Sequence, residues 1–441
     1  RQSRGAARAC IEAPGNGGVA LLGAASLTLT ACGGGDADPG ATASSATSET
    51  SAAADNSQAP VVEGDGTLTV GSLLPQTGAL AFLGPPEFAG VQLALNDINA
   101  AGGYNNKDVV YNQTDSGDTT TNIASQSVDR LLAANTDAII GAASSGVSFT
   151  VVDAITAAGA IQVSPANTSP DFTTYADRGL YWRTAPSDVL QGRVMGDLLI
   201  NDGHLDVATI TLDDPYGSGL QTNIQQAVEA GGGQIVNNSV FNPDAATFDS
   251  VASDVAGASP DAIVVIGFEQ TVQIIQALIT QNIGPSTTPI YFVDGNLADY
   301  STDFPAGTLE GVKGTLPGAA TTDDFRSRLL QVDPSLADFS YAPESYDATV
   351  LVALAAHAAK NDSGTGIASQ MQAVSEGGEK CTSFQQCLEL LNAGTDIDYD
   401  GFSGPIEFDA NGDPTQATIG VYQYGADNKY TNVAYQEGSL S

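Results

Sequence analysis

Histidine is scarce in this sequence, and its scarcity argues against several classes of enzyme. Among 441 residues only His204 and His357 are histidines. They are too far apart and too isolated to form a zinc motif or to serve a Ser/His/Asp triad. The sequence also lacks a G-x-S-x-G nucleophile elbow, a phosphate loop and a dinucleotide-binding fingerprint. An exported hydrolase would therefore have no nucleophile with a partner, and we expect neither enzymatic activity nor a cofactor.

Basic residues are also few. Lysine and arginine together number 14 against 51 acidic residues, which gives a formal net charge of −37. A chain this acidic repels phosphate, so its charge excludes nucleic acid as a partner and disfavours polyanionic ligands. There is also no run of about 20 apolar residues, and we therefore predict no transmembrane helix.

The four cysteines are expected to have different fates. A basic region at residues 1–8 and an apolar stretch at 19–30 are typical of an export signal. Residues 29–32, Leu-Thr-Ala-Cys, match the bacterial lipobox, so we expect cleavage of a signal peptide at 1–31 and acylation of Cys32. Cys10 would be lost with the signal. The alternative is a chance cysteine after an alanine-rich stretch. Residues 32–65 follow as a flexible tether, because their segment 33–58 is poor in apolar residues and free of aromatic ones.

Cys381 and Cys387 remain as a pair with C-x5-C spacing. In an exported protein such a pair most often forms a disulfide. Thr382 or Ser383 can cap a helix that would place Cys387 in its first turns. We expect no metal site there, since no histidine or further cysteine lies nearby, and a redox-active pair would more naturally be C-x2-C.

A second candidate metal motif fails on its spacing. Asp409, Asn411 and Asp413 begin like a calcium loop, but Pro414 stands where glycine is needed and Gly420 where glutamate is needed. We interpret this segment as a hairpin turn and expect no metal site.

From residue 67 onward, apolar strands alternate with helical patterns, and the rhythm restarts after residue 186. Such a succession predicts an α/β fold with two doubly wound parallel-sheet lobes and a ligand cleft between them. The predicted strands are 68–74, 109–112, 138–141, 161–164, 207–212, 234–240, 262–267 and 290–294. The predicted helices are 86–100, 121–134, 148–158, 187–201, 218–229, 247–256 and 271–281.

Polar residues follow two of the predicted strands of the first lobe. Ser144, Ser145 and Gly146 follow 138–141 and open a helix, and Ala166 and Thr168 follow 161–164. A ligand carboxylate placed there would meet hydroxyls and free backbone N–H groups at a helix N-terminus, where the helix dipole favours negative charge. The alternative is that these residues only cap helices.

The segments 73–103, 137–147, 161–170 and 181–188 resemble extracytoplasmic solute-binding proteins of the leucine/isoleucine/valine type. The resemblance covers roughly residue 67 to the C-terminus. It implies two lobes joined by a three-strand hinge, which we place near residues 186, 315–317 and 403–405. Lobe 1 would then comprise 66–186 plus 315–404, and lobe 2 would comprise 187–314 plus 405–441, with 408–424 returning as a strand pair.

The resemblance also implies roles for individual residues. Ser145, Ala166 and Thr168 match carboxylate-binding positions, and Asp294 matches an acidic residue that faces the ligand's ammonium group. Tyr216 matches a cleft-facing tyrosine, and Phe268 is a weaker match. Leu83 departs from the family pattern, because several relatives carry a large aromatic residue there. Asp294 could instead be a turn former, and Tyr216 could pack over its own helix.

These observations predict a lipid-anchored solute-binding protein that captures a small zwitterionic ligand, an amino acid of branched-chain type or a relative, for the permease of an ATP-driven ABC importer. The protein would be a monomer, anchored through Cys32 to the outer face of the cell membrane. Two alternatives stay open. One is a ligand-sensing ectodomain of the same fold, and the other is an importer-binding protein for urea, short amides or aromatic acids.

Overall fold

The computed structural model describes residues 59–440. The predicted signal peptide, Cys10, Cys32 and most of the predicted tether lie outside these residues. The described part contains two large sheets, each covered by helices, and a small two-stranded sheet. The predicted two-lobed α/β fold is confirmed. We call each large sheet with its helices a lobe, while the residue boundaries of the lobes stay predictions.

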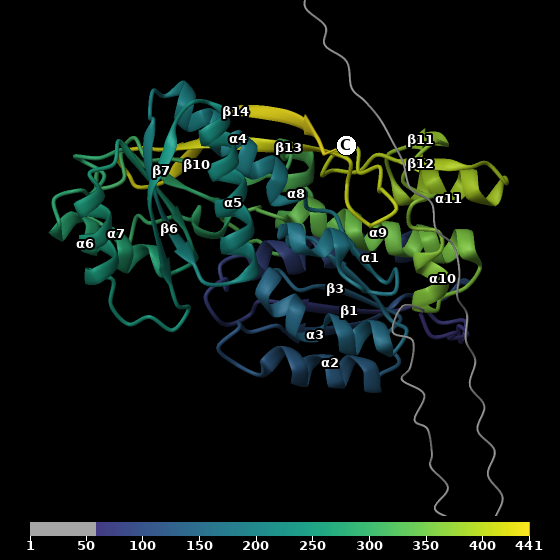
Figure 1. Cartoon of the computed structure of the whole chain (residues 1–441). Coiled ribbons are helices and arrows are strands. Elements are labelled where there is room, and N and C mark those ends of the chain that lie inside the picture. The colour runs from purple at the N-terminus through teal and green to yellow at the C-terminus, as the bar shows by residue number, and fades with distance from the viewer. Residues whose placement is uncertain (1–58, 441) are drawn as a thin grey trace, which may run out of the picture. The chain divides into compact units, whose positions relative to one another are not determined.

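The first sheet is entirely parallel, with strand order β2-β1-β3-β4-β5. Its central strands are fully buried, as expected when helices cover both faces of a sheet. Helices α1 and α9 lie on one face and α2 and α3 on the other (Figure 1). Its strands are β1 (Thr69–Leu74), β2 (Val110–Asp115), β3 (Ala138–Gly141), β4 (Ile161–Ser164) and β5 (Tyr181–Arg183), and the helices between them are α1 (Gly84–Ala100), α2 (Ile123–Ala133) and α3 (Ser145–Ala157).

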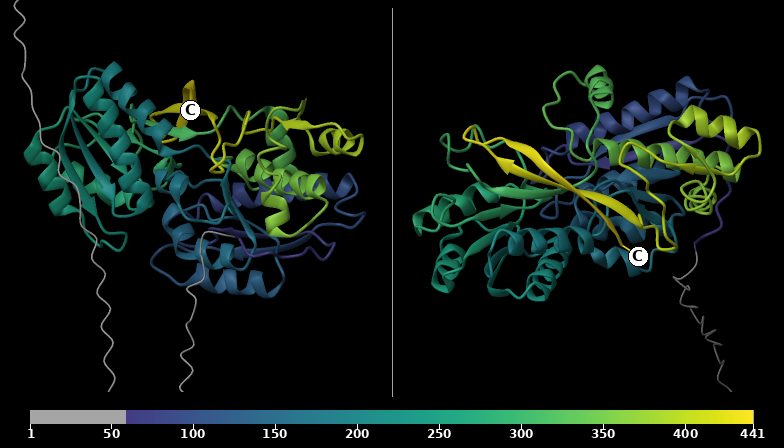
Figure 2. Two further views of the ribbon diagram at one scale, coloured as in Figure 1. Left: turned by 45° about the vertical axis from the view of Figure 1, so that its right-hand side comes forward. Right: turned by 90° about the horizontal axis from the view of Figure 1, so that it is seen from above.

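The second sheet has the order β14-β13-β10-β9-β8-β6-β7 and is parallel except where β13 pairs with β10 and β14. The paired β13 and β14 form a long ribbon at one edge of the sheet, seen from above in Figure 2. The strands are β6 (Asp206–Leu212), β7 (Gln234–Phe241), β8 (Ala262–Ile266), β9 (Ile290–Phe292), β10 (Lys313–Pro317), β13 (Gln416–Tyr424) and β14 (Tyr430–Ser439). The helices of this half are α4 (Asp188–Asn201), α5 (Pro215–Ala230), α6 (Asp249–Ala258) and α7 (Thr271–Thr280).

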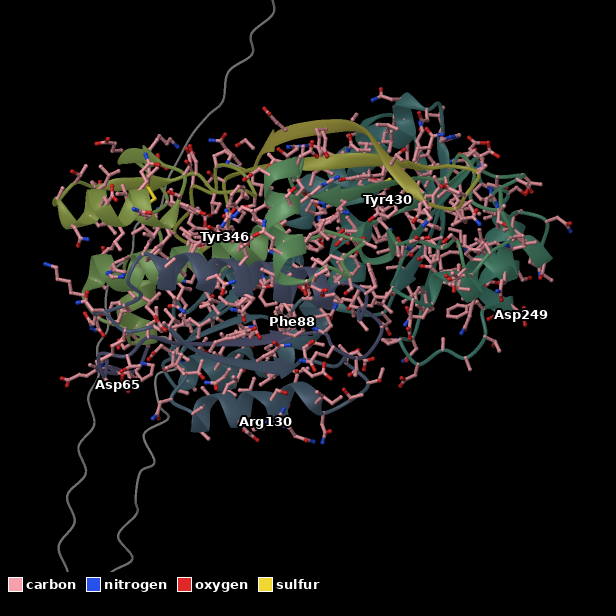
Figure 3. All side chains as sticks on the ribbon, turned by 180° about the vertical axis from the view of Figure 1, so that it is seen from behind. Asp65, Phe88, Arg130, Asp249, Tyr346 and Tyr430 are labelled. Atoms are coloured by element: carbon pink, nitrogen blue, oxygen red, sulfur yellow. A yellow bond between two sulfur atoms is a disulfide. The ribbon has the colours of Figure 1, made fainter. Side chains whose placement is uncertain are left out.

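A helical segment between β10 and β13 completes the first lobe. Its helix α9 (Ala342–Ala359) is buried over most of its length and packs against α1. Tyr346 of α9 belongs to this core and the partly buried Phe88 of α1 packs against it, whereas Arg130 of α2 lies on the exposed outer side (Figure 3). The other elements are α8 (Asp323–Val332), α10 (Gly364–Ala368), β11 (Glu379–Cys381), α11 (Phe384–Asn392) and β12 (Ile397–Tyr399).

Cys381 and Cys387 are joined by a disulfide, with their Cα atoms 5.4 Å apart (Figure 3). Ser383 caps α11 by accepting a hydrogen bond from the Gln386 backbone N–H at 3.3 Å, and Cys387 lies in the first turns of the helix. The structure thus contains the predicted disulfide beside the predicted cap.

Two C-terminal predictions compare differently with the structure. Residues 409–413 form the expected turn, in which the Asp409 Oδ1 atom accepts hydrogen bonds from the backbone N–H groups of Asn411 and Asp413. The predicted strand pair at 408–424 is wrong in its extent. Only 416–424 forms a strand, and its hairpin partner is β14, at 430–439. The sequence of β14 carries little apolar alternation, in keeping with a strand whose residues are all partly or fully exposed, so no local pattern predicted it.

Within residues 59–440, none of the helices combines the length and apolar character needed to cross a membrane.

Candidate functional site

The carboxyl ends of β3 and β4 place the predicted polar residues of the first lobe side by side. Ser144 is the N-cap of α3, and its hydroxyl accepts a hydrogen bond from the Val147 N–H at 3.3 Å. The Ser145 hydroxyl accepts from the Ser169 N–H at 3.3 Å, which leaves its own hydrogen for another acceptor. Ser144 therefore caps α3, while the Ser145 hydroxyl retains a donor.

The loop after β4 is held from inside the lobe. Asn167 donates its amide hydrogens to the carbonyl oxygens of Ala142 and Ala143, at 3.0 and 2.8 Å. The Ser164 hydroxyl accepts from the backbone N–H of Ala166 at 3.3 Å. The Ala166 N–H, predicted as a ligand donor, thus has an internal partner in this conformation.

A buried arginine supports the same loop from behind. Arg183 donates to the carbonyl oxygen of Ser169 at 2.7 Å and to that of Asn167 at 3.4 Å. Its charge is balanced by Asp413, whose carboxylate lies 2.6 Å from Nε and 3.0 Å from Nη2. The nearby Asp413 and its hydrogen bonds raise the pKa of Arg183 despite burial. A buried ion pair therefore supports the loop behind the predicted carboxylate site.

Asp294 occupies the opposite side of the site, where β9 ends and a short turn begins. Its Oδ1 atom accepts from the Tyr216 hydroxyl at 2.7 Å and from the Gln191 amide at 3.0 Å, and its Oδ2 atom accepts from the Tyr341 hydroxyl at 2.8 Å. Burial raises the pKa of Asp294, and these donors offset part of that rise. Tyr341 lies at the N-cap of α9, so its bond to Asp294 joins the two lobes.

Tyr216 and Phe268 form one aromatic wall. Tyr216 lies in the first turn of α5, which Asp214 caps by accepting from the Gly217 N–H at 2.7 Å. The rings of Tyr216 and Phe268 are stacked with centroids 5.5 Å apart. Tyr216 therefore faces the site rather than covering only its own helix.

Most of the predicted residues meet at one small cavity between the lobes. The cavity is lined by Leu80, Leu83, Ala143, Ser144, Ser145, Ala166, Tyr216, Phe268, Asp294, Gly295 and Tyr341. Gly146 and Thr168 are buried nearby but do not line it. Its volume of about 10 Å³ suffices for no more than a single water molecule. The lobes are thus closed on each other, and an amino acid requires them to open.

Larger cavities flank this point on two sides. One of about 180 Å³ shares Leu80, Ser144 and Phe268 with the small cavity, and one of about 460 Å³ shares Tyr341. The interface between the lobes is therefore a cleft that narrows at the contact of Tyr341 with Asp294.

Sequence reasoning missed three polar residues that contact or support the site, namely Tyr341, Gln191 and Arg183. Tyr341 precedes a helix rather than following a strand, so the search at strand ends passed over it. Gln191 reaches Asp294 from α4, far away in the sequence, so no local pattern marked it. Arg183 lies in a buried strand, and a charged residue in such a strand indicates that a side chain of opposite charge pairs with it.

Comparison with curated proteins finds relatives along most of the chain. A chemotactic signal transduction substrate-binding protein, BasB, from Halobacterium salinarum is 26% identical over 360 residues, covering 79% of this chain and 84% of its own. A leucine-, isoleucine-, valine-, threonine- and alanine-binding protein from Pseudomonas aeruginosa is 23% identical over 378 residues, covering 83% of this chain and 92% of its own.

Solved structures share the fold. The substrate-binding protein LivJ from Streptococcus pneumoniae, in complex with isoleucine, matches with a TM-score of 0.68 and 22% identity, covering 85% of this chain and 99% of its own. A solute-binding protein from R. palustris in complex with benzoate matches with a TM-score of 0.67 and 19% identity, covering 85% of this chain and 98% of its own.

Residues 67–429 match the family model described as "Periplasmic binding protein". Proteins of this family are extracytoplasmic solute-binding proteins that serve ABC transporters, and they bind small molecules without transforming them. This chain belongs to the periplasmic binding protein family, as a solute-binding protein rather than an enzyme.

Proposed function

We propose that this protein captures a small zwitterionic ligand, an amino acid of branched-chain type or a relative, and delivers it to an ABC importer. The observation that carries the proposal is the pairing of opposite environments across one cavity. Ser144, Ser145 and Ala166 end two strands on one side, and the buried Asp294 lies on the other. A carboxylate suits the first environment and an ammonium group suits the second.

The relatives support this ligand class. The Pseudomonas relative is named for five amino acids, and LivJ was crystallised with isoleucine. The benzoate complex favours a second candidate ligand, an aromatic acid, which would use the carboxylate side but leave Asp294 without a cationic partner. The BasB relative favours delivery to a signalling system as the second candidate function.

A thermal-shift screen tests the ligand class. The ligand-stripped protein is heated with common amino acids, urea, short amides and benzoates. A ligand present at 100 times its Kd adds about 2.7 kcal/mol to the free energy of unfolding. We expect amino acids to stabilise the protein. If only benzoates stabilise it, the proposed ligand is an aromatic acid and not a zwitterion.

The proposal includes a lipid anchor at Cys32, with the protein acting as a monomer at the outer face of the membrane. The lipobox and the aromatic-free tether support it. Replacing Cys32 with serine should release the protein into the medium, as measured by cell fractionation. Retention of the Cys32→Ser protein in the membrane fraction would contradict the anchor and leave the ligand assignment untouched.

A further inference from the structure

The start of α9 meets the segments that connect the two lobes. The chain passes between the large sheets at 184–187, after β5, at 318–322, after β10, and at 400–415, after β12. The Thr184 hydroxyl donates to the backbone carbonyl oxygen of Glu344 at 2.9 Å. The backbone N–H and the hydroxyl of Ser403 each donate to the Asp347 carboxylate at 2.6 Å. Two of the three connecting segments are therefore bonded to the first turns of this helix.

The third connecting segment lies against the Glu344 side chain. Gly318 has a φ of +121°, and a side chain there would place its Cβ atom 2.9 Å from Glu344 Oε1. A cavity of about 10 Å³ lies between the three segments and is lined by residues of each, among them Thr184, Gly318 and Ser403. Among the described residues that line it, Glu344 is the only acid. Its carboxylate is thus packed between the segments that must move apart when the lobes open.

The titratable groups nearest to Glu344 are acids and a phenol. Glu87 of α1 faces it, as do Asp347 and Tyr341 of its own helix. Glu87 has no exposed surface, and neither of its carboxylate oxygens has a hydrogen-bond partner among the described residues. Buried polar atoms nearly always have partners, so a second carboxyl group beside Glu344 without any needs an explanation.

No base compensates Glu344. Within residues 59–440 none of the ion pairs includes it. Glu344 also lines the cavity of about 460 Å³, where the two bases are Arg326 and Lys429. Arg326 is exposed and lies over the ring of Phe339, and Lys429 pairs with Asp299. The remaining acid of that cavity, Asp338, accepts a hydrogen bond from a tyrosine.

Glu344 and Glu87 are therefore neutral in the closed protein at neutral pH. Burial raises the pKa of Glu344 to about 8, with Asp347 adding to the rise and a backbone hydrogen bond opposing it. Burial also raises the pKa of Glu87 well above its usual range, and Glu344 adds to that rise. Asp347 ionises first, since burial raises its pKa only to about 6 against its hydrogen bonds.

We propose that the start of α9 is the pivot on which the lobes open, and that Glu344 controls the opening by its charge. The neutral side chain permits the three connecting segments to pack together, and the ionised side chain favours their separation. Opening admits water to the cavity between the segments, and hydration lowers the cost of an ionised carboxylate. Tyr341, the N-cap of the same helix, donates to Asp294 at 2.8 Å, so the pivot is joined to the closed cleft. The inference holds whichever ligand the cleft takes.

The direction of the pH effect follows from where Glu344 holds its proton more tightly. An acid whose pKa is higher in the closed form favours closure fully below its ordinary pKa of 4.5. That favour is lost as the pH rises to about 8, where the closed form also ionises. The equilibrium constant for closing should therefore fall with rising pH, by up to tenfold per unit, and level off above pH 8.

The test is small-angle X-ray scattering of the ligand-free protein from about pH 6, where Asp347 is ionised, to about pH 9. The radius of gyration of the wild type should rise up to about pH 8 and then level off. Glu344→Gln keeps the size of the side chain and cannot ionise, so its radius should stay small throughout. Glu376→Gln, at an exposed position between α10 and β11, is the matched control and should follow the wild type. A purely structural role for Glu344 predicts no such difference in pH profile.

Two results would overturn the inference. One is a wild type whose radius does not change over this range, and the other is a folded Glu344→Gln protein that still opens as the pH rises. If the Tm shows that Glu344→Gln does not fold, Asp347→Asn takes its place. It removes the neighbouring charge, so the wild-type transition should move to lower pH, and an unmoved transition would overturn the inference equally. None of these results concerns the ligand, so the proposed function would stand.

Discussion

The two sides of the cleft are suited to opposite charges, and they are built from different chemical groups. The side formed by the ends of β3 and β4 consists of hydroxyls, backbone groups and a helix start, with Arg183 behind it. The side that contains Asp294 consists mainly of side chains, namely that buried acid and two phenols, beside Gly295. One side is prepared for a negative group by backbone geometry, and the other is prepared for a positive group by buried charge.

The difference has a physical basis in how each charge is stabilised. A carboxylate can be bound by neutral donors at a helix N-terminus, which remain satisfied by other partners when the ligand is absent. An ammonium group needs acceptors, and a buried carboxylate is strong but destabilised while it has no cation. Substitutions on the acidic side should therefore affect binding more than substitutions on the neutral side.

The largest effect is expected on the free energy of unfolding, from a change in Arg183, which supports the loop of the neutral side. Arg183→Met leaves Asp413 buried without its partner, and breaking a buried pair in this way costs about 3–5 kcal/mol. Urea unfolding should show a loss of that size. Arg193→Met, at an exposed position of α4, should change the free energy of unfolding little. Equal losses in both proteins would show that Arg183 has no special role.

On the acidic side, Asp294→Asn keeps the shape of the side chain and removes its charge. An amino-acid ligand should then bind about 30-fold more weakly or worse, since loss of a buried charge partner costs about 2–5 kcal/mol. Calorimetry measures the change, and a ligand without an ammonium group should be nearly indifferent to it. Asp299→Asn, at a half-exposed acid that pairs with Lys429, serves as the control. If the Asp294→Asn protein binds the amino acid with unchanged affinity, the amino-acid proposal is contradicted and an amide becomes the proposed ligand.

Removing the Cys381–Cys387 disulfide, which lies outside both sides of the cleft, should lower stability without changing ligand affinity. Replacing Cys381 and Cys387 with serine removes a disulfide that closes a short loop, with a sequence separation of 6 residues. The chain-entropy relation gives about 2 kcal/mol for such a loop. Chemical unfolding should show a loss of this order while calorimetry shows unchanged ligand affinity. A weaker ligand complex in the double serine protein would show that this region affects the cleft.

The smallest effect is expected for Thr168→Val on the neutral side. A single hydroxyl hydrogen bond is worth about 1 kcal/mol, so affinity should fall roughly fivefold. Calorimetry can resolve this change, with Thr222→Val on the exposed face of α5 as a control. If Thr168→Val weakened binding as much as Asp294→Asn does, the acidic side would not matter more for affinity than the neutral side.

The parts of the fold that local pattern controls could be predicted from the sequence. The strands β1, β3 and β4 and the helix α1 are strongly apolar or periodic segments, and they appear within one or two residues of the predicted bounds. The strand β14 could not be predicted, because its stability comes from pairing with β13 rather than from its own pattern. The same holds for β10, which pairs on one side with β13 from a distant part of the chain.

The residues of the candidate site also fall into two groups, those that could be predicted from the sequence and those that could not. Residues that end strands, such as Ser144, Ser145 and Asp294, could be selected from their position in the pattern. Tyr341 and Gln191 could not, because they reach Asp294 from helices far away in the sequence. Long-range contacts of side chains leave no local signal unless a charge is out of place, as with Arg183.

The bond between Tyr341 and Asp294 has a consequence for the protein while it waits for cargo. In this closed conformation the phenol donates to the carboxylate that the proposed ligand would engage. Because the two residues come from opposite lobes, the bond stabilises a closed protein without ligand, and it keeps Asp294 from being a bare buried charge while the site is empty. Under the proposed function, a ligand must replace this bond, so Tyr341 lowers the net gain in free energy on binding.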